Sequence, residues 1–220
     1  MNKIKLSERL KATAGFVKKG SRVADVGTDH GFIPVCLMQE GLADKVIASD
    51  INEGPLSSAV RTAEEYEVSG IDFRLCDGLK GIKQEEADTV IIAGMGGETI
   101  ISIIEASGWS WEGKTLILQP MSKQAELIIR LYEKGFSVLE ETFVYEGKEA
   151  YRILKVIFKP APLPRLAYIY GGFTYGRYTE KQIKKLTRAV KGMEKSSEPD
   201  IRTEEYKAVL EDMKAAYVHD

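Results

Sequence analysis

The sequence has few of the residues that form disulfide scaffolds or metal sites. It contains two cysteines, Cys36 and Cys76, and two histidines among 220 residues. Because the cysteines do not have a metal-binding spacing, we expect neither a disulfide framework nor a metal site. The sequence also lacks an apolar leader at its N-terminus and any hydrophobic run long enough to span a bilayer. We therefore expect a cytoplasmic protein without a membrane partner.

Neither sign of charge dominates the sequence. The formal net charge is −2, so bulk charge argues neither for nor against nucleic acid as a partner. Hydrophobic residues make up 44% of the sequence and charged residues 29%, as in ordinary globular proteins. A chain of 220 residues can form one full domain with a sizeable core and an appendage.

Strand-like and helix-like segments alternate along the first two thirds of the sequence. An amphipathic helix over residues 6–19, with Ser7 as its cap, is followed by expected strands at 22–26, 45–49, 71–75, 89–93 and 114–118 and expected helices at 32–40, 54–68, 97–106 and 122–134. The apolar strands suit a parallel sheet that is covered on both faces. Residues 136–145 and 150–158 alternate around Glu146-Gly147-Lys148, which predicts an antiparallel hairpin. This order predicts an α/β fold of the Rossmann-like methyltransferase type.

The end of the sequence predicts a different architecture. Pro160, Pro162 and Pro164 mark the end of the sheet domain, and we interpret the segment up to residue 176 as a surface linker. Two stretches with apolar residues at helical spacing follow, separated by residues 196–200. The sequence thus predicts a domain over residues 1–160, and a linker with a C-terminal helical hairpin or coiled coil over 161–220.

The segment from Asp25 to Gly31 is the most informative motif. It follows the apolar run 23–26 and leads directly into an expected helix, which is how α/β sheets form nucleotide sites. Asp50 ends the next expected strand, at about the 20-residue separation typical of a ribose-binding acid. The sequence therefore predicts a cofactor of the adenosine type.

The motif departs from the dinucleotide fingerprint in one position. Asp29 stands where G-x-G-x-x-G requires a glycine, so the pattern is D-x-G-x-D-x-G. A carboxylate here repels a pyrophosphate but attracts the ammonium and sulfonium of S-adenosylmethionine through Asp25 or Asp29. This charge argument favours S-adenosyl-L-methionine over NAD. The alternative is that Gly27 and Gly31 form a tight turn in a sheet that binds no nucleotide.

Two further segments belong to the same edge of the expected sheet. Ala93-Gly94-Met95-Gly96-Gly97 ends the fourth strand, and its glycines indicate a backbone that passes close to another group. Gln119-Pro120-Met121 ends the fifth strand. Gln119 either contacts a base edge or is a satisfied polar strand cap.

These motifs resemble those of a known family, the bacterial TrmK-type tRNA (adenine-22-N1)-methyltransferases. The resemblance lies in Leu6-Ser7-Glu8-Arg9-Leu10, Asp25-Val26-Gly27-Thr28-Asp29-His30-Gly31, Ala48-Ser49-Asp50-Ile51-Asn52, Ala93-Gly94-Met95-Gly96-Gly97 and Leu118-Gln119-Pro120. It extends over about residues 1–158 and implies S-adenosylmethionine as methyl donor, tRNA as substrate and a C-terminal coiled coil. The cofactor-binding residues that it implies are Arg9, Gly27, Asp29, Asp50, Ile51, Asp77, Gly78, Gly94 and Gln119. We also expect Asp25, Asn52 and Met95, which belong to the same motifs, to bind the cofactor. Asp77 is either the acid that accepts from the adenine amino group or, with Gly78, a simple turn after the strand. Its position relative to Gly27 and Asp50 favours the first interpretation.

Two basic segments suit an RNA partner. Lys3, Lys5, Arg9, Lys11, Lys18, Lys19 and Arg22 oppose only Glu8, and Arg177, Lys181, Lys184, Lys185, Arg188, Lys191 and Lys195 oppose Glu180 and Glu194. A single basic helix is more often a solvated face, but the two segments together are typical of phosphate-backbone contacts. The aromatic residues between 168 and 178 either stack on bases or pack the C-terminal helices.

The expected reaction is methylation of adenine N1 in an unpaired or flipped nucleotide, with Asp29 and His30 as the candidate catalytic residues. Two alternatives remain open: a methyltransferase for a small molecule or protein, and a non-catalytic RNA-binding module with a degenerate cofactor fold. A dehydrogenase is disfavoured by Asp29. The sequence does not determine the oligomeric state.

Overall fold

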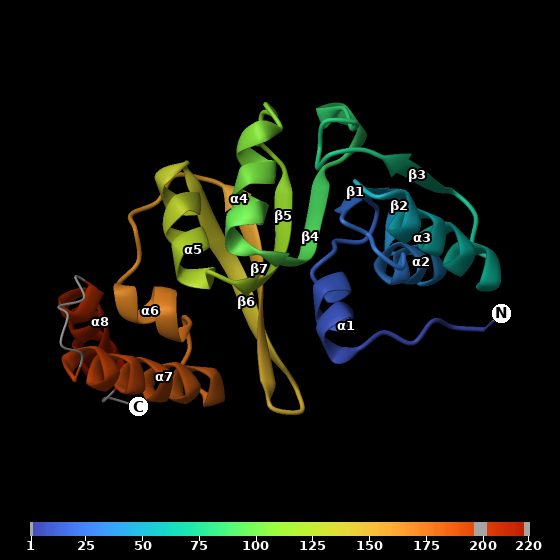
Figure 1. The fold of residues 1–220 in the computed structure, drawn as a ribbon. Coiled ribbons are helices and arrows are strands. Elements are labelled where there is room, and N and C mark those ends of the chain that lie inside the picture. The colour runs from blue at the N-terminus through green and yellow to red at the C-terminus, as the bar shows by residue number, and fades with distance from the viewer. Residues whose placement is uncertain (1, 196–201, 218–220) are drawn as a thin grey trace. The chain divides into compact units, whose positions relative to one another are not determined.

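The structure, a computed structural model, describes residues 2–195 and 202–217. The chain divides into two compact units, Met1–Ala161 and Pro162–Asp220 (Figure 1). Each unit has its own buried core.

The first unit contains a seven-stranded sheet. In chain order its strands are β1 (Ser21–Val26), β2 (Ala43–Asp50), β3 (Ile71–Leu75), β4 (Thr89–Gly96), β5 (Thr115–Ser122), β6 (Phe136–Glu146) and β7 (Glu149–Phe158). In space the order is β3-β2-β1-β4-β5-β7-β6. Neighbours among β1 to β5 are parallel, whereas β7 lies antiparallel between β5 and β6. The Rossmann-like methyltransferase sheet that the sequence predicts is thereby confirmed.

Helices cover both faces of this sheet. They are α1 (Glu8–Gly15), α2 (Phe32–Gln39), α3 (Glu53–Glu65), α4 (Gly97–Ala106) and α5 (Gln124–Glu133), with a short 3-10 helix, η1 (Gln84–Glu86). Helix α2 packs against α1 and α3 on one side, and α4 packs against α5 on the other (Figure 1). The apolar strands are therefore shielded from water on both sides, which explains their lack of alternation.

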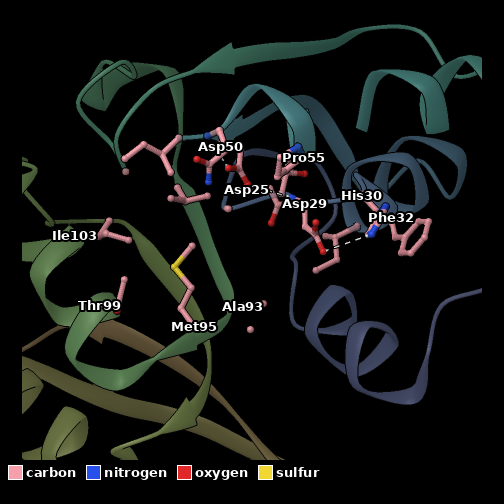
Figure 2. Close-up of a pocket in the computed structure, with 18 of the residues that line it drawn as sticks. Asp25, Asp29, His30, Phe32, Asp50, Pro55, Ala93, Met95, Thr99 and Ile103 are labelled. Carbon is pink, nitrogen blue, oxygen red and sulfur yellow. Dashed lines mark hydrogen bonds and ion pairs between the residues drawn. The ribbon is translucent and has the colours of Figure 1, made fainter. Parts of the chain in front are cut away.

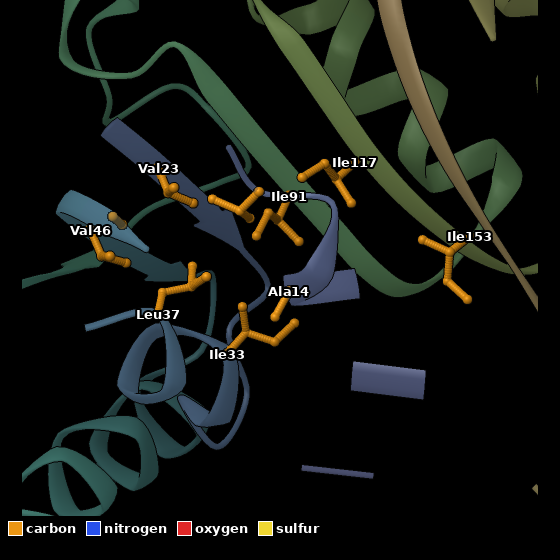
Figure 3. Close-up of a cluster of buried hydrophobic side chains, with 10 residues drawn as sticks. Ala14, Val23, Ile33, Leu37, Val46, Ile91, Ile117 and Ile153 are labelled. Carbon is orange, nitrogen blue, oxygen red and sulfur yellow. The ribbon is translucent and has the colours of Figure 1, made fainter. Parts of the chain in front are cut away.

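A buried core lies between the sheet and helices α1 and α2 and holds them together. Val23, Val46 and Ile91, from three strands, are fully buried, and Leu37 of α2 packs against them (Figure 3). Burial of one such side chain contributes about 1.5–3 kcal/mol. The same cluster includes Ala14, Ile33, Ile117 and Ile153.

The first helix is shorter than the expected span of 6–19. Ser7 caps it as predicted, with its Oγ accepting from the Leu10 backbone N–H at 3.5 Å. The helix ends at Gly15. The chain then turns into β1 through Gly20, whose φ of +83° lies in the left-handed region that ends helical structure.

The second unit consists of helices, and the expected linker is part of it. Helices α6 (Leu166–Gly171), α7 (Arg177–Glu194) and α8 (Arg202–Tyr217) share a core in which Ala167 and Met213 are fully buried. The interpretation of the segment up to residue 176 as a surface linker was therefore wrong for α6. Asp212 fixes the start of α6 by accepting from Arg165 Nη2 at 2.6 Å and from the Ala167 N–H at 2.9 Å. The expected break at residues 196–200 lies outside the described residues.

The strand order sets the place where a ligand can bind. From β1 the chain crosses over to β2 and β3 in one direction, while β4 and β5 lie on the other side of β1. The direction of winding thus changes between β1 and β4. Open α/β sheets bind ligands in the crevice at the carboxyl ends of the strands at such a point.

Candidate functional site

A cavity of about 670 Å³ lies at this point, beside the carboxyl ends of β1, β2, β3 and β4 (Figure 2). Its volume is in the range of about 300–1,000 Å³ that is usual for small-ligand sites. Most of the residues that we expect to bind a cofactor line this cavity. They are Arg9, Asp25, Gly27, Asp29, Asp50, Ile51, Asn52, Asp77, Gly78, Gly94 and Met95. His30 lines it as well.

The turn between β1 and α2 forms one wall and has an unusual backbone. Gly27, Asp29 and Gly31 all have positive φ, at +73°, +51° and +69°. The N–H groups of Gly27 and Thr28 both donate to the Ser49 carbonyl, at 2.8 and 2.9 Å, which ties the turn to β2. A Cβ at Gly31 would lie 2.8 Å from Cβ of Ala59 in α3, so Gly31 is required for helix packing.

Asp29 is the exception in this turn because it is not a glycine. The left-handed conformation costs an L-residue about 1–2 kcal/mol, although aspartate tolerates it better than most. Its side chain is 70% exposed and lies with Oδ2 3.8 Å from His30 Nε2. A non-glycine residue in this conformation at a cavity wall points to a use for its side chain.

His30 lies beside an aromatic ring at the same wall. Its ring stacks on Phe32, with centroids 5.4 Å apart and an interplanar angle of 16°. Phe32 is 38% exposed and starts α2. Both residues line the cavity, and Figure 2 shows them side by side.

Two buried carboxyl groups lie deeper in the cavity. Asp25, at 3% exposure, ends β1 next to Val26, and burial together with the nearby charge of Asp50 raises its pKa to about 7. Asp50 ends β2, and its Oδ1 accepts from the Asn52 N–H at 2.9 Å. Its Oδ2 lies 3.4 Å from the Asp29 backbone nitrogen. The backbone thus orients Asp50 while leaving acceptor capacity for ligand hydroxyls.

Asp77 and Gly78 follow β3 at the rim of the cavity. The Asp77 carboxylate is exposed and accepts from Lys80 Nζ at 2.5 Å. Gly78 has a φ of +59°, and a Cβ there would lie 3.1 Å from Ile103. A ligand that binds the Asp77 carboxylate therefore competes with Lys80.

Gln119 does not line the cavity, contrary to the expectation that it meets a base edge or the cofactor. It is fully buried. Its Oε1 accepts from Arg9 Nη1 at 2.7 Å and from the Gly94 N–H at 3.1 Å. Gln119 is thus a satisfied polar residue behind the wall, and Arg9 is the group that reaches the cavity.

The glycines at the end of β4 have separate causes. Gly94, with a φ of +78°, lines the cavity beside Arg9. A Cβ at Gly97 would lie 2.4 Å from the Lys123 carbonyl oxygen, and one at Gly96 would lie 3.2 Å from Ser122 Oγ. Gly97 is therefore required by the close approach of the β5–α5 connection, whereas a Cβ at Gly96 needs only a small shift of the Ser122 side chain. Gly94 is the one of the three that has a positive φ beside the cavity.

Several apolar lining residues were not predicted from the sequence. They are Leu10, Phe32, Ile33, Pro55, Ile103 and Met121, together with the polar Thr99. Thr99 and Ile103 lie four residues apart in α4, so both project from one helix face. The spacing was visible in the sequence, but an apolar helix face normally indicates packing against the core.

Both basic segments contain exposed cations, and some cations of each take part in ion pairs. In the first, Lys3 pairs with Glu40 at 2.9 Å and Arg22 with Asp88 at 3.3 Å, while Arg9 belongs to the cavity. In the second, every basic side chain of the set Arg177, Lys181, Lys184, Lys185, Arg188, Lys191 and Lys195 is exposed. They recur every three or four residues, opposite the buried Leu186 and Val190. Helix α7 and Lys195 thus present a continuous basic surface, which we call the α7 basic face.

Among the aromatic residues between 168 and 178, packing accounts for several. Tyr178 is buried, and Tyr168 stacks on Phe173 at 6.1 Å and meets Tyr217 edge-on. Tyr175 is 48% exposed.

Across residues 2–195 and 202–217, no group of three His, Cys, Asp or Glu side chains has the arrangement of a metal site. None of the helices in these ranges is both long and apolar enough for a membrane crossing.

The sheet is parallel with an antiparallel β7–β6 end, and an acid-lined cavity lies at its switch point. This is the arrangement of the Rossmann-like methyltransferase class. The sequence matches the model of the methyltransferase-domain family over residues 6–154, and the chain belongs to this family.

Individual proteins and solved structures are similar to this chain as well. The chain is 38% identical over 156 residues to the tRNA (adenine(22)-N(1))-methyltransferase of Bacillus subtilis, covering 70% of this chain and 66% of that protein. The aligned part thus spans about two thirds of the relative's length. The crystal structure of the B. subtilis m1A22 tRNA methyltransferase TrmK matches 97% of this chain and 99% of its own, with a TM-score of 0.86 and 27% identity. These similarities confirm the resemblance drawn from the sequence motifs.

A second solved structure bears on the ligand. A Streptococcus pneumoniae protein in complex with S-adenosyl-L-methionine matches 96% of this chain and 97% of its own, with a TM-score of 0.78 and 28% identity.

Proposed function

We propose that this protein transfers a methyl group from S-adenosyl-L-methionine to N1 of an adenosine in tRNA, at position 22. The observation that carries the proposal is the likeness to the B. subtilis m1A22 enzyme over both units of the chain. A tRNA substrate also supports the cytoplasmic location expected from the sequence.

The residues of the cavity fit this cofactor by their chemistry. Bound S-adenosylmethionine supplies a methyl group on a cationic sulfonium, and it carries an ammonium, a carboxylate and an adenosine. Asp25 is the buried acid for the ammonium, and Asp50 is the acceptor for the ribose hydroxyls. Asp77 at the rim is the acceptor for the adenine amino group, in exchange for its contact with Lys80.

The substrate base requires positioning more than proton transfer. Adenine N1 has an in-plane lone pair, so it can attack without prior deprotonation, and the product is a cationic base. The Asp29 carboxylate at the cavity wall stabilises that charge as it develops. The stacked His30 and Phe32 rings offer a surface for a base that has been taken out of its helix. These assignments make Asp29 the catalytic residue and His30 a base-contacting residue.

The α7 basic face is the proposed contact for the tRNA backbone. Its cations are exposed, and they line up over the length of one helix. An exposed basic helix face binds phosphates independently of sequence, which suits a protein that must first hold a folded RNA.

The proposal is tested by incubating the full chain with unmodified tRNA and methyl-labelled cofactor, followed by nucleoside analysis. We expect label in 1-methyladenosine, and its loss when adenosine 22 is replaced by guanosine. Label in another nucleoside, or unchanged labelling of the substituted tRNA, contradicts the proposed target. Calorimetry with S-adenosylhomocysteine, run in parallel, distinguishes a non-catalytic binding module, which would give no binding heat.

A further inference from the structure

We propose that Gln119 is a positioning residue that holds Arg9 in place, without a salt bridge, for the carboxylate of the cofactor's amino-acid end. This inference rests on the proposed function, because it assumes an amino-acid ligand in the cavity. Gln119 itself does not touch the ligand.

Arg9 is held from several sides, yet its guanidinium forms no salt bridge with the residues that the structure describes. Its backbone N–H donates to Glu146 Oε1 at 2.8 Å, a contact that also lowers the pKa of Glu146. Its guanidinium donates to Gln119 and lies 5.4 Å from the centre of the Tyr151 ring. Within residues 2–195 and 202–217, no carboxylate oxygen lies within 4 Å of the guanidinium nitrogens.

The missing ion pair is notable because carboxylates are abundant nearby. Asp25, Asp29, Asp50 and Asp77 line the same cavity. Glu146 accepts a hydrogen bond from the Arg9 main chain, and its charge acts on the guanidinium only from beyond salt-bridge distance. A half-buried cation that has only neutral acceptors retains most of its attraction for an incoming anion. Arg9 is therefore available for an anionic ligand group.

Gln119 supplies the neutral acceptor that makes this arrangement possible. Arg9 Nη1 and the Gly94 N–H can only donate, so both contacts require the amide oxygen, which fixes the orientation of the amide. Its Nε2 lies 3.3 Å from Met121 Sδ. Full burial leaves the side chain little freedom. One amide thus connects α1 to the ends of β4 and β5.

The charge state of position 119 is therefore the critical property. A glutamate of the same shape would accept the same hydrogen bonds but would neutralise Arg9. The cavity has carboxylates from the ends of β1, β2 and β3, and one guanidinium from α1. This combination of charges matches a zwitterionic amino-acid group, with its ammonium near the acids and its carboxylate near Arg9.

The test compares two ligands that differ in that group. S-adenosylhomocysteine carries the amino acid, whereas 5′-methylthioadenosine lacks it. In calorimetry on the full chain, we expect Gln119→Glu to weaken binding of the former by about tenfold or more. Binding of the latter should stay within about twofold. Gln124→Glu, at the start of α5 and outside the cavity lining, adds the same charge and should leave both affinities unchanged.

A double-mutant cycle separates positioning from a structural role. In an Arg9→Met background, Gln119→Glu should no longer change the ratio of the two affinities. Gln119→Met, which is neutral and of similar length, gives a second route if the glutamate variant does not fold. It should lower the same ratio by several-fold, because Arg9 loses its anchor.

The outcomes also separate this inference from the proposed function. If the wild-type chain binds neither ligand, the proposed function fails. If it binds both and Gln119→Glu weakens them equally, or leaves the ratio unchanged, the positioning role is overturned while the function stands.

Discussion

At the scale of single residues, strain and burial mark the site more clearly than residue type. Asp29 occupies a left-handed backbone conformation that glycine would adopt without cost, and Asp25 is buried where desolvation penalises its charged form. Each arrangement disfavours the folded protein, and each places a carboxylate at the cavity. Replacing such a residue is therefore expected to raise the stability of the fold and to lower the activity.

Asp29 provides the first prediction. Asp29→Gly relieves the left-handed conformation, so we expect the free energy of unfolding to rise or stay within about 1 kcal/mol of wild type. Methyl transfer to tRNA should fall by about a hundredfold or more, because the charge beside the substrate base is removed. Asp29→Asn, which tolerates the same backbone and has the same shape, serves as the matched variant. Turnover near the wild-type rate in Asp29→Asn would remove the carboxylate from the mechanism.

Asp25 provides a prediction of pH dependence. The pKa of Asp25 is about 7 in the folded protein, above its ordinary value of 3.8. The unfolded chain therefore loses this proton at lower pH, and the free energy of unfolding falls as the pH rises from 3.8 towards 7. A ligand ammonium favours the ionised form. We therefore expect the affinity for S-adenosylhomocysteine to increase with pH below about 7, by up to about tenfold per unit, and to level off above it. Calorimetry between pH 5.5 and 8 measures this, and Asp25→Asn should abolish the slope. The same slope in that variant would assign the proton to another group.

At the scale of elements, helix α7 combines two functions on opposite faces. Leu186 and Val190 face the core of the second unit, and the cations of the α7 basic face are exposed. Because the two stripes do not overlap, the charge can be changed without altering the packing. Helix α6 has no comparable exposed charged face, because Ala167, Ile169 and Gly171 of its short length are buried.

The α7 basic face provides a prediction on tRNA binding. Replacing Lys184, Lys185, Arg188 and Lys191 by glutamine should weaken binding and reduce the dependence of log Kd on log salt concentration by about 0.7–0.9 for each phosphate that is no longer neutralised. Fluorescence titration at several salt concentrations measures both effects, and circular dichroism should show an unchanged helix content. The matched control is Lys207→Gln with Lys214→Gln in α8, whose amines pair with glutamates. Equal weakening in both variants would indicate a general charge effect.

At the scale of the whole molecule, the sheet was predictable because its strands are apolar and its turns are rich in glycine and acids. Parallel strands place their carboxyl ends at one edge, so Asp25, Asp50 and Asp77 could be brought together from the sequence alone. The burial of Gln119 could not, because a polar residue at a strand end has the same pattern whether it faces a ligand or the interior. Helix α6 is too short and too rich in aromatic residues for helical periodicity to indicate it.

The division into two units provides a further prediction. A chain of residues 1–161 retains the complete cavity, so we expect it to bind S-adenosylhomocysteine within about threefold of the full chain. Methylation of tRNA should fall by about a hundredfold or more, because the shortened chain has no α7 basic face. Calorimetry and the nucleoside assay measure the two quantities separately. Undiminished methylation by the shortened chain would favour a small-molecule substrate or an RNA contact within the first unit.

The position of β7 between β5 and β6 has a consequence for synthesis on the ribosome. Until residue 158 has left the exit tunnel, the outer edge of β5 has no neighbour in the sheet. Arg9 is synthesised well before Glu146 and Tyr151, so its surroundings are complete only after these two residues have emerged. A nascent chain can therefore acquire the cofactor only after the last strand of the first unit has joined, and cofactor capture reports the end of folding of that unit.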